Sequence, residues 1–155
     1  MYCANCGEEV KLKRWYVNAY VGDINVGKYP MLNLVCSKCG CVTGCNTVDK
    51  RNKELERMFW RDYYDIIPTK EILQIPKKYR ISRKLIDEIL CIKPKGIFGE
   101  KSIWMGELPN SAEDERLKRA LNDPQYMLEA AEKSTISEHD KERVRKRVCK
   151  LLENA

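Results

Sequence analysis

The chain contains a single histidine, His139, and lacks the residue patterns of several enzyme classes. An HNH-type nuclease site cannot be built without a second histidine. Walker-type and GxGxxG loops are absent, which removes the common phosphate-cradling nucleotide sites. No serine, cysteine or carboxylate pair has a partner at a spacing typical of nucleophilic or acid–base catalysis. The sequence therefore predicts a protein that is not an enzyme, with His139 as a solvated residue near the start of a helix.

Long apolar runs are also missing. No stretch approaches about 18 consecutive apolar residues, so the sequence predicts no transmembrane helix and no membrane partner. The first ten residues have neither the basic start nor the apolar centre of a signal peptide. A content of 43% hydrophobic and 34% charged residues is typical of a soluble globular protein. We expect a cytoplasmic location.

Cysteine, by contrast, is abundant: six of the eight cysteines lie in the first 45 residues. In a reducing compartment, clustered Cys-x-x-Cys pairs indicate metal or redox chemistry rather than disulfides. The segment CANCG (3–7) returns as CSKCG (36–40), and the glycine that ends each copy suits a sharp turn. Two such turns supply the four thiolates of a closed structural zinc site. The predicted ligands of one Zn²⁺ are Cys3, Cys6, Cys36 and Cys39.

Other interpretations of the cysteines stay open. An iron–sulfur cluster also uses four cysteines, whereas a thioredoxin-like redox pair would need a βαβ context that the flanks do not offer. Cys41 or Cys45 could replace a ligand of the second pair, although both are expected in the strand that leaves it. Cys91 and Cys149 stand alone among apolar neighbours, which predicts small core residues.

The segments around the two cysteine pairs predict short strands. Residues 11–21 are rich in aromatic and β-branched side chains, residues 22–30 are turn-like, and residues 31–35 form a second strand. Residues 41–48 could supply a third. Residues 1–48 are therefore expected to form a zinc ribbon that needs its metal to fold.

Two Cys-x-x-Cys pairs spaced 33 residues apart, followed by a helical module, resemble the MqsA/YgiT-type zinc-finger antitoxin regulators. The resemblance covers about the first 45 residues. It implies that the zinc domain engages a partner protein and that a following helix-turn-helix domain binds DNA.

The positive charge of the chain is concentrated in its middle. The formal net charge is +6, and residues 50–95 hold thirteen Lys and Arg against seven Asp and Glu. Apolar spacing and helix-start residues predict helices over 49–67, 69–75 and 81–90. Two short strands around Gly99-Glu100-Lys101 predict a hairpin. Three helices and a hairpin in this order predict a winged helix-turn-helix domain over residues 49–108.

Residues 79–90, YRISRKLIDEIL, resemble the turn and recognition helix of GntR-type regulators. Such a helix presents its N-terminal end to the major groove. The predicted DNA contacts are Arg83, Lys84, Lys77, Lys78, Arg80 and Lys101. Alternatively, this segment is an ordinary packing unit whose lysines face solvent.

Two features depart from the helix-turn-helix pattern. Pro76 and the basic residues after it predict a longer connection before Ser82 than the usual tight turn. Asp87 and Glu88 would face phosphate unless they contact cytosine or bond to neighbouring groups.

Residues 109–155 are expected to form a helical tail that packs on the middle domain or dimerises. Helices are predicted from Asn110 or Ser111, from Asp123-Pro124, and from about Ser137 to Leu152. The apolar stripe of the last helix consists of Val144, Val148, Leu151 and Leu152. Six basic residues surround this stripe and could contact phosphate.

The predicted fold class is thus α+β, a small four-cysteine zinc ribbon followed by a mostly helical, winged helix-turn-helix-like domain. The predicted function is a zinc-containing DNA-binding transcriptional regulator. The alternative is a protein-binding adaptor or inhibitor, antitoxin-like or phage-encoded, and RNA binding is a third possibility. The contact surface of such an adaptor would be the aromatic residues Trp15, Tyr16, Tyr20 and Tyr29.

Overall fold

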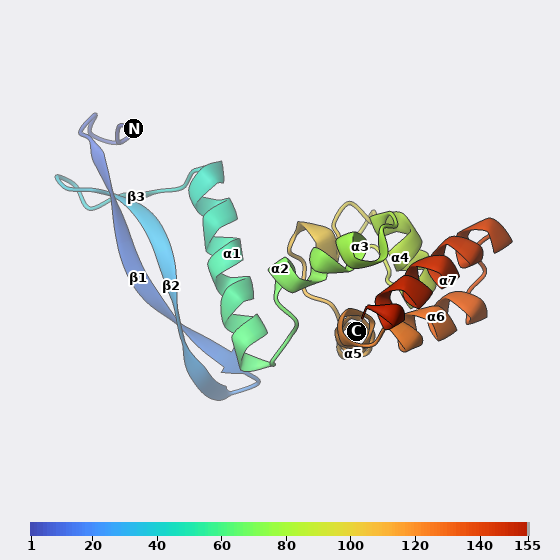
Figure 1. Cartoon of the computed structure of the whole chain (residues 1–155). Coiled ribbons are helices and arrows are strands. Elements are labelled where there is room, and N and C mark those ends of the chain that lie inside the picture. Colours follow the sequence, from blue (N-terminus) through green and yellow to red (C-terminus); the bar gives the residue numbers. More distant parts are fainter. Residues whose placement is uncertain (155) are drawn as a thin grey trace. The chain divides into compact units, whose positions relative to one another are not determined.

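The computed structural model describes residues 1–154 and divides into two compact units (Figure 1). The hairpin unit is Met1–Tyr63, and the helical unit begins at Tyr64. Helix α1 (Asn46–Tyr63) packs against strand β2 and so belongs to the hairpin unit. This division differs from the boundary at residue 48 that the sequence indicates.

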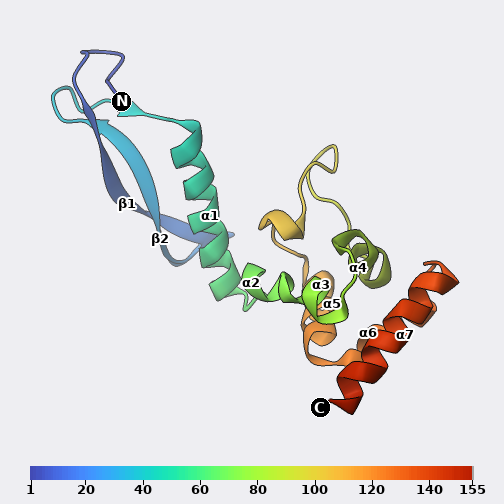
Figure 2. The same ribbon diagram turned by 45° about the horizontal axis from the view of Figure 1, so that its top comes forward.

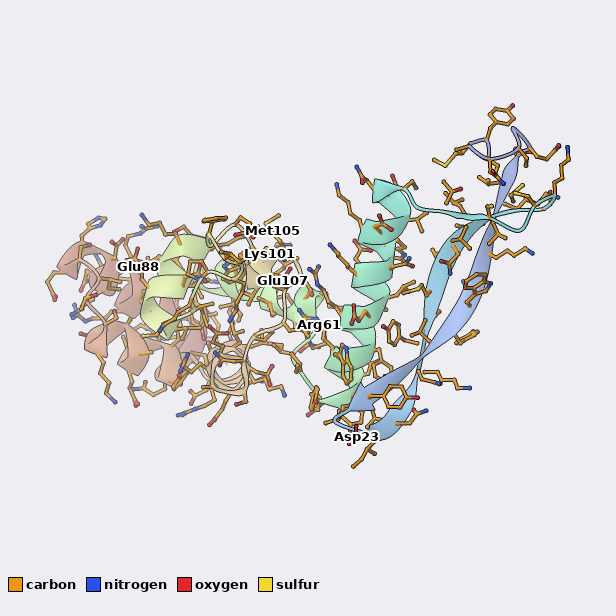
Figure 3. All side chains as sticks on the ribbon, turned by 180° about the vertical axis from the view of Figure 1, so that it is seen from behind. Asp23, Arg61, Glu88, Lys101, Met105 and Glu107 are labelled. Carbon is orange, nitrogen blue, oxygen red and sulfur yellow. The ribbon has the colours of Figure 1, made fainter. Side chains whose placement is uncertain are left out.

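Three antiparallel strands form the sheet of the hairpin unit in the order β1-β2-β3. Their bounds are β1 Val10–Val21, β2 Ile24–Cys36 and β3 Val42–Thr43. Asp23 marks the tip, in a two-residue turn with Gly22 (Figure 3). Most of the segment 22–30, expected as a turn, is therefore strand: pairing with the aromatic residues of β1 outweighs its glycine and proline content.

Helix α1 lies along β2 in both ribbon views (Figures 1 and 2). It begins three residues before Asp49 and ends before Pro68. The ring of Phe59 packs on Tyr29, with 5.6 Å between the ring centroids. A Cβ at Gly27 would lie 3.1 Å from the Phe59 ring, so the absence of a side chain there permits the close approach. Val17 and Ala19, which pair with Tyr29 and Gly27, lie on this same face of the hairpin.

Asn52 of α1 hydrogen-bonds to the backbone of β2 at Leu32. The Leu32 N–H donates to Asn52 Oδ1 at 2.7 Å, and Asn52 Nδ2 donates to the Leu32 carbonyl at 2.9 Å. Strand β3 pairs only with Leu34 and Val35, so this edge of β2 has no strand partner at Leu32. The amide of Asn52 replaces that partner, and α1 protects the sheet edge.

Replacing Asn52 with alanine should lower the free energy of unfolding of the hairpin unit by about 1–3 kcal/mol. The change removes both hydrogen bonds and leaves a partly buried N–H and C=O unpaired. Denaturant unfolding followed by circular dichroism measures the effect. Lys53→Ala, at an exposed position of the same helix, is the matched control, and equal stability of the two variants would contradict the role of Asn52.

The helical unit has its own apolar core. Its elements are α2 Thr69–Ile72, α3 Gln74–Tyr79, α4 Arg83–Leu90, the 3-10 helix η1 Ile103–Met105, α5 Ser111–Asn122, α6 Pro124–Lys133 and α7 Glu138–Glu153. Helices α6 and α7 pack side by side. The predicted helix starts at Ser82, Asn110, Asp123 and Ser137 are confirmed, since each side chain accepts a backbone N–H of its helix. None of the helices within residues 1–154 has the length and apolar character needed to cross a membrane.

The prediction that Cys91 and Cys149 are core residues is wrong, because both are exposed. Cys91 follows the last residue of α4 in a left-handed conformation with φ 51°. In α7 the buried positions are Val144 and Val148, and the residue after Val148 points away from the core. Leu152 is also half exposed, so the buried stripe is narrower than expected.

The hairpin expected around residues 99–101 is reduced to a single β-bridge between Lys95 and Lys101. In place of a second strand the chain forms η1, in which both Ile103 and Trp104 are buried. Adjacent residues of a strand point to opposite faces, so a strand would have exposed one of the two. A two-stranded wing is therefore absent from the described part of the helical unit.

Candidate metal centre and candidate nucleic-acid interface

Two short turns carry the four clustered cysteines. The Gly7 N–H donates to the Cys3 carbonyl at 2.8 Å, and the Gly40 N–H donates to the Cys36 carbonyl at 3.0 Å. Gly7 and Gly40 have φ of 71° and 72°, in the left-handed region that favours glycine. The repeated Cys-x-x-Cys-Gly pattern thus encodes the same turn twice, once before β1 and once after β2.

The four predicted ligands come together. All four sulfur atoms lie within 4.8 Å of one another. The Sγ–Sγ distances are 3.6 Å for Cys3–Cys39, 3.4 Å for Cys6–Cys36 and 3.6 Å for Cys6–Cys39. A tetrahedron with Zn–S bonds of about 2.3 Å has edges of about 3.8 Å. The donor set therefore fits a zinc ion, and four protein ligands would leave no open position for substrate.

The cysteine cluster also takes part in the apolar packing at one end of the hairpin. Cys3 and Cys36 are buried with Val10, and Leu34 packs against them. The exposed Cys39 closes the cluster on its outer side. A bound metal would join the chain before β1 to the end of β2.

Cys41 and Cys45 are outside the group of four and flank β3 rather than lie within it. Cys41 is nevertheless close: Asn5 Nδ2 donates to its sulfur at 3.6 Å. Two hydrogen bonds from Cys41 lower the pKa of the Cys39 thiol to about 6. The larger effect is that of the Cys41 backbone N–H, and the smaller is that of its thiol. A lowered pKa favours the thiolate form that a metal ligand requires.

A short turn joins the helices α3 and α4. Pro76 occupies the first turn of α3, where its missing N–H is tolerated, and the helix continues to Tyr79. Three residues follow before α4: Arg80 in a left-handed conformation with φ 55°, Ile81, and Ser82, whose Oγ accepts the Leu85 N–H at 3.2 Å. The longer connection expected from the sequence is wrong, and the three-residue turn is of helix-turn-helix length.

The predicted DNA contacts differ in their surroundings. Five of them are exposed: Lys77, Arg80, Arg83, Lys84 and Lys101. Lys78 is partly buried, its ammonium donates to the Leu121 carbonyl, and burial lowers its pKa. Lys78 therefore stabilises the fold rather than standing free on the surface. The guanidinium of Arg83 lies 5.9 Å from the centroid of the Trp104 ring.

The two acids of α4 also differ. Asp87 Oδ1 accepts the indole N–H of Trp104 at 2.9 Å, and burial raises its pKa. The sequence leaves two alternatives for Asp87, a contact with cytosine or a bond to a neighbouring group. In the structure Asp87 bonds to a neighbouring group, the indole of Trp104. Glu88 is exposed on α4 (Figure 3).

Helix α7 carries the six basic residues that the sequence offers as a second surface for phosphate. Four of them line one hollow together with Arg80 of the α3–α4 turn: Arg143, Lys146, Arg147 and Lys150. Their spacing of i, i+3, i+4 and i+7 places them on one helix face. This spacing is visible in the sequence and could have identified the four residues as one basic face. What the sequence could not show is that this face adjoins the turn before α4.

Comparison with protein-family models, with curated proteins and with solved structures yields no significant match.

Proposed function

We propose that this chain is a zinc-containing DNA-binding protein of the transcription-regulator type, in which α3 and α4 form the DNA-binding helix-turn-helix. The observation that carries the proposal is the three-residue turn, which sets three exposed basic side chains at the N-terminal end of α4. These are Arg80, Arg83 and Lys84. A recognition helix uses this end to reach base edges in the major groove.

The packing of α4 supports this orientation. Leu85, Ile86, Ile89 and Leu90 are all buried, so one face of the helix is fixed in the core. Arg83 and Lys84, in the first turn, remain outside. The positive end of the helix dipole lies at the same place and adds to their attraction for phosphate.

The charges at this end are uncompensated. Within residues 1–154, Arg80, Arg83 and Lys84 form no ion pair with an acidic side chain. One of the two acids of α4, Asp87, is engaged by the indole N–H of Trp104. Free cationic groups are what counterion-releasing contacts with DNA require.

The double variant Arg83→Ala/Lys84→Ala should bind duplex DNA at least tenfold more weakly and lose its preference for its own upstream sequence. If both side chains contact phosphate, the slope of log affinity against log salt should fall by roughly 2. Fluorescence anisotropy across a salt series measures both quantities.

Lys70→Ala/Lys133→Ala is the matched control, because it removes the same charge at exposed positions of α2 and α6. It should retain sequence preference. Unchanged affinity of the Arg83/Lys84 variant, with an intact circular dichroism spectrum, would show that α4 is not the recognition helix.

The hairpin favours a second candidate, recognition of a protein partner. Leu12 and Tyr16 lie on the face opposite Val17, away from the side that Phe59 covers, and they are 56% and 64% exposed. Trp15 and Tyr20 are also exposed, whereas Tyr29 packs on Phe59 and is not part of this surface. Exposed aromatic side chains are favoured at interfaces. This candidate predicts no duplex binding at any salt concentration.

A further inference from the structure

One face of α7 and the α3–α4 turn line an open, positively charged hollow of about 230 Å³, called here the basic hollow. Its wall consists of Tyr79, Arg80, Ile81, Arg143, Lys146, Arg147 and Lys150. Five of these seven residues are basic and none is acidic. The two others, Tyr79 and Ile81, supply an aromatic ring and an apolar side chain, and both are buried.

Arg147 is held in place within the basic hollow. Its Nε donates to the Lys78 carbonyl at 2.8 Å, and the side chain is partly buried. This bond uses one donor and leaves the two terminal nitrogens of the guanidinium for an acceptor. A guanidinium fixed in this way loses little further freedom on binding, and its fork matches two oxygens of a phosphate.

The charges of the basic hollow are only partly compensated. Arg143 pairs with Asp140 at 3.2 Å, and Lys146 lies 3.6 Å from Glu142. In the part of the chain that the structure describes, the other three form no ion pair: Arg80, Arg147 and Lys150. Three like charges around one hollow repel one another, and a bound anion would relieve that repulsion.

The basic hollow is continuous with the N-terminal end of α4. Arg143 also lines a neighbouring hollow, whose other residues are Ser82, Lys84, Leu85, Glu88 and Asp140. Arg143 therefore lines both hollows, and the hollow beside α4 carries two basic and two acidic side chains. Phosphates beside a recognition helix are the contacts that fix its register on DNA.

We propose that the basic hollow binds one phosphate group of the DNA backbone, next to the bases that α4 contacts. This inference rests on the proposed function and adds a second, sequence-independent contact to it. Arg147 and Arg80 donate to the phosphate oxygens, and Lys146 and Lys150 supply charge at the rim. The buried Tyr79 and Ile81 supply no donor, since the Tyr79 hydroxyl already donates to the Ala120 carbonyl.

Lys146→Ala/Lys150→Ala should weaken binding to the preferred duplex and to an unrelated duplex by the same factor. The salt slope should fall by about 1, and sequence preference should be retained. Arg147→Lys, which keeps the charge but removes the fork, should weaken both duplexes equally as well. Fluorescence anisotropy across a salt series gives the affinities for both duplexes, the sequence preference and the salt slope. The single variant Lys133→Ala is the control, and thermal unfolding checks that each variant is folded.

A second readout is independent of DNA. Inorganic phosphate, titrated against chloride at matched ionic strength, should shift the Arg147 and Arg80 Nε–H resonances to saturation in nitrogen-15 NMR spectra. The Lys146→Ala/Lys150→Ala variant should show a weaker effect.

The outcomes separate the two proposals. If duplex binding depends on Arg83 and Lys84 but is unchanged in affinity by Lys146→Ala/Lys150→Ala and by Arg147→Lys, the basic hollow is a solvated face. The inference is then overturned, while the proposed function stands. If no duplex binds at low salt, the proposed function fails and the backbone contact fails with it. Resonances that do not respond to phosphate overturn the hollow as an anion site whether or not DNA binds.

Discussion

Chelating the metal should unfold the hairpin unit and leave the helical unit folded. Among the described residues, the buried cluster around the four cysteines contains only Cys3, Val10 and Cys36, so little apolar packing holds this end of the hairpin together without the ion. Structural zinc contributes apparent binding energies of about 10–16 kcal/mol near neutral pH, and in small domains this is folding energy. The described part of the helical unit has nineteen buried apolar residues of its own and contains none of the four ligands.

One zinc ion per chain should be released when the thiols are blocked with a mercurial reagent, as measured with a chromogenic chelator. Nitrogen-15 NMR spectra should then lose the dispersed resonances of residues 1–63 and keep those of the helical unit. Cys36→Ser should give the same spectrum without any chelator. A coloured protein that contains iron would support the iron–sulfur interpretation instead.

Cys41→Ser and Cys149→Ser are the controls for the ligand set. Both should retain one zinc ion, because neither sulfur belongs to the group of four. The Cys41 variant is the stringent case, since Cys41 hydrogen-bonds to Cys39 and is the nearest replacement ligand. Loss of zinc from Cys41→Ser together with its retention in Cys39→Ser would mean that Cys41 is a ligand in place of Cys39.

The features that the sequence predicts correctly are local ones. A Cys-x-x-Cys-Gly turn is determined by five neighbouring residues, and its two copies need only a hairpin to bring them together. The helix starts at Ser82 and Asn110 likewise depend on a side chain three residues from its backbone partner. Such contacts are visible in the spacing of residue types.

Contacts between distant residues could not be predicted. Apolar spacing predicts that one face of α1 packs on another element, but only the structure shows that α1 lies against β2 and that Asn52 bonds to the edge of that strand. The turn at Ile103 and Trp104 depends on a hydrogen bond to Asp87, seventeen residues earlier. Helical spacing identifies Arg143 and Arg147 as basic residues of one helix, and only packing brings them beside Arg80.

Glu113 is the clearest example of a residue whose contacts with distant residues could not be predicted from the sequence. In the sequence it is one of several charged residues in SAEDERLKR, a composition typical of a solvated helix start. In the structure only 1% of it is exposed. Its carboxylate accepts the backbone N–H groups of Asn110 at 2.9 Å and Lys93 at 3.2 Å, and it pairs with the ammonium of Lys95. One buried carboxylate thus holds the start of α5 and the loop after α4.

Glu113→Ala should lower the free energy of unfolding of the helical unit by about 3–5 kcal/mol, because it leaves Lys95 without its partner and two N–H groups without an acceptor. Glu115→Ala, at an exposed position of the same helix, should change it by less than about 0.5 kcal/mol. Denaturant unfolding at neutral pH measures both. Glu113→Gln should lie between them, since it keeps the shape and one acceptor oxygen but loses the charge.

The effect of Glu113 should depend on pH in a direction fixed by its pKa. Burial alone would raise that pKa, but the bonds from Lys95 and from the N–H groups of Asn110 and Lys93 hold it below the ordinary value of 4.5. A carboxyl whose pKa is lower in the folded than in the unfolded state stabilises the fold above the unfolded value. That stabilisation is lost as the pH falls through the lowered folded value. The stability difference between the wild type and Glu113→Ala should therefore be constant near neutral pH and shrink below pH 4.5. A difference that stays constant through acid pH would mean that the ionised carboxylate is not what stabilises this end of α5.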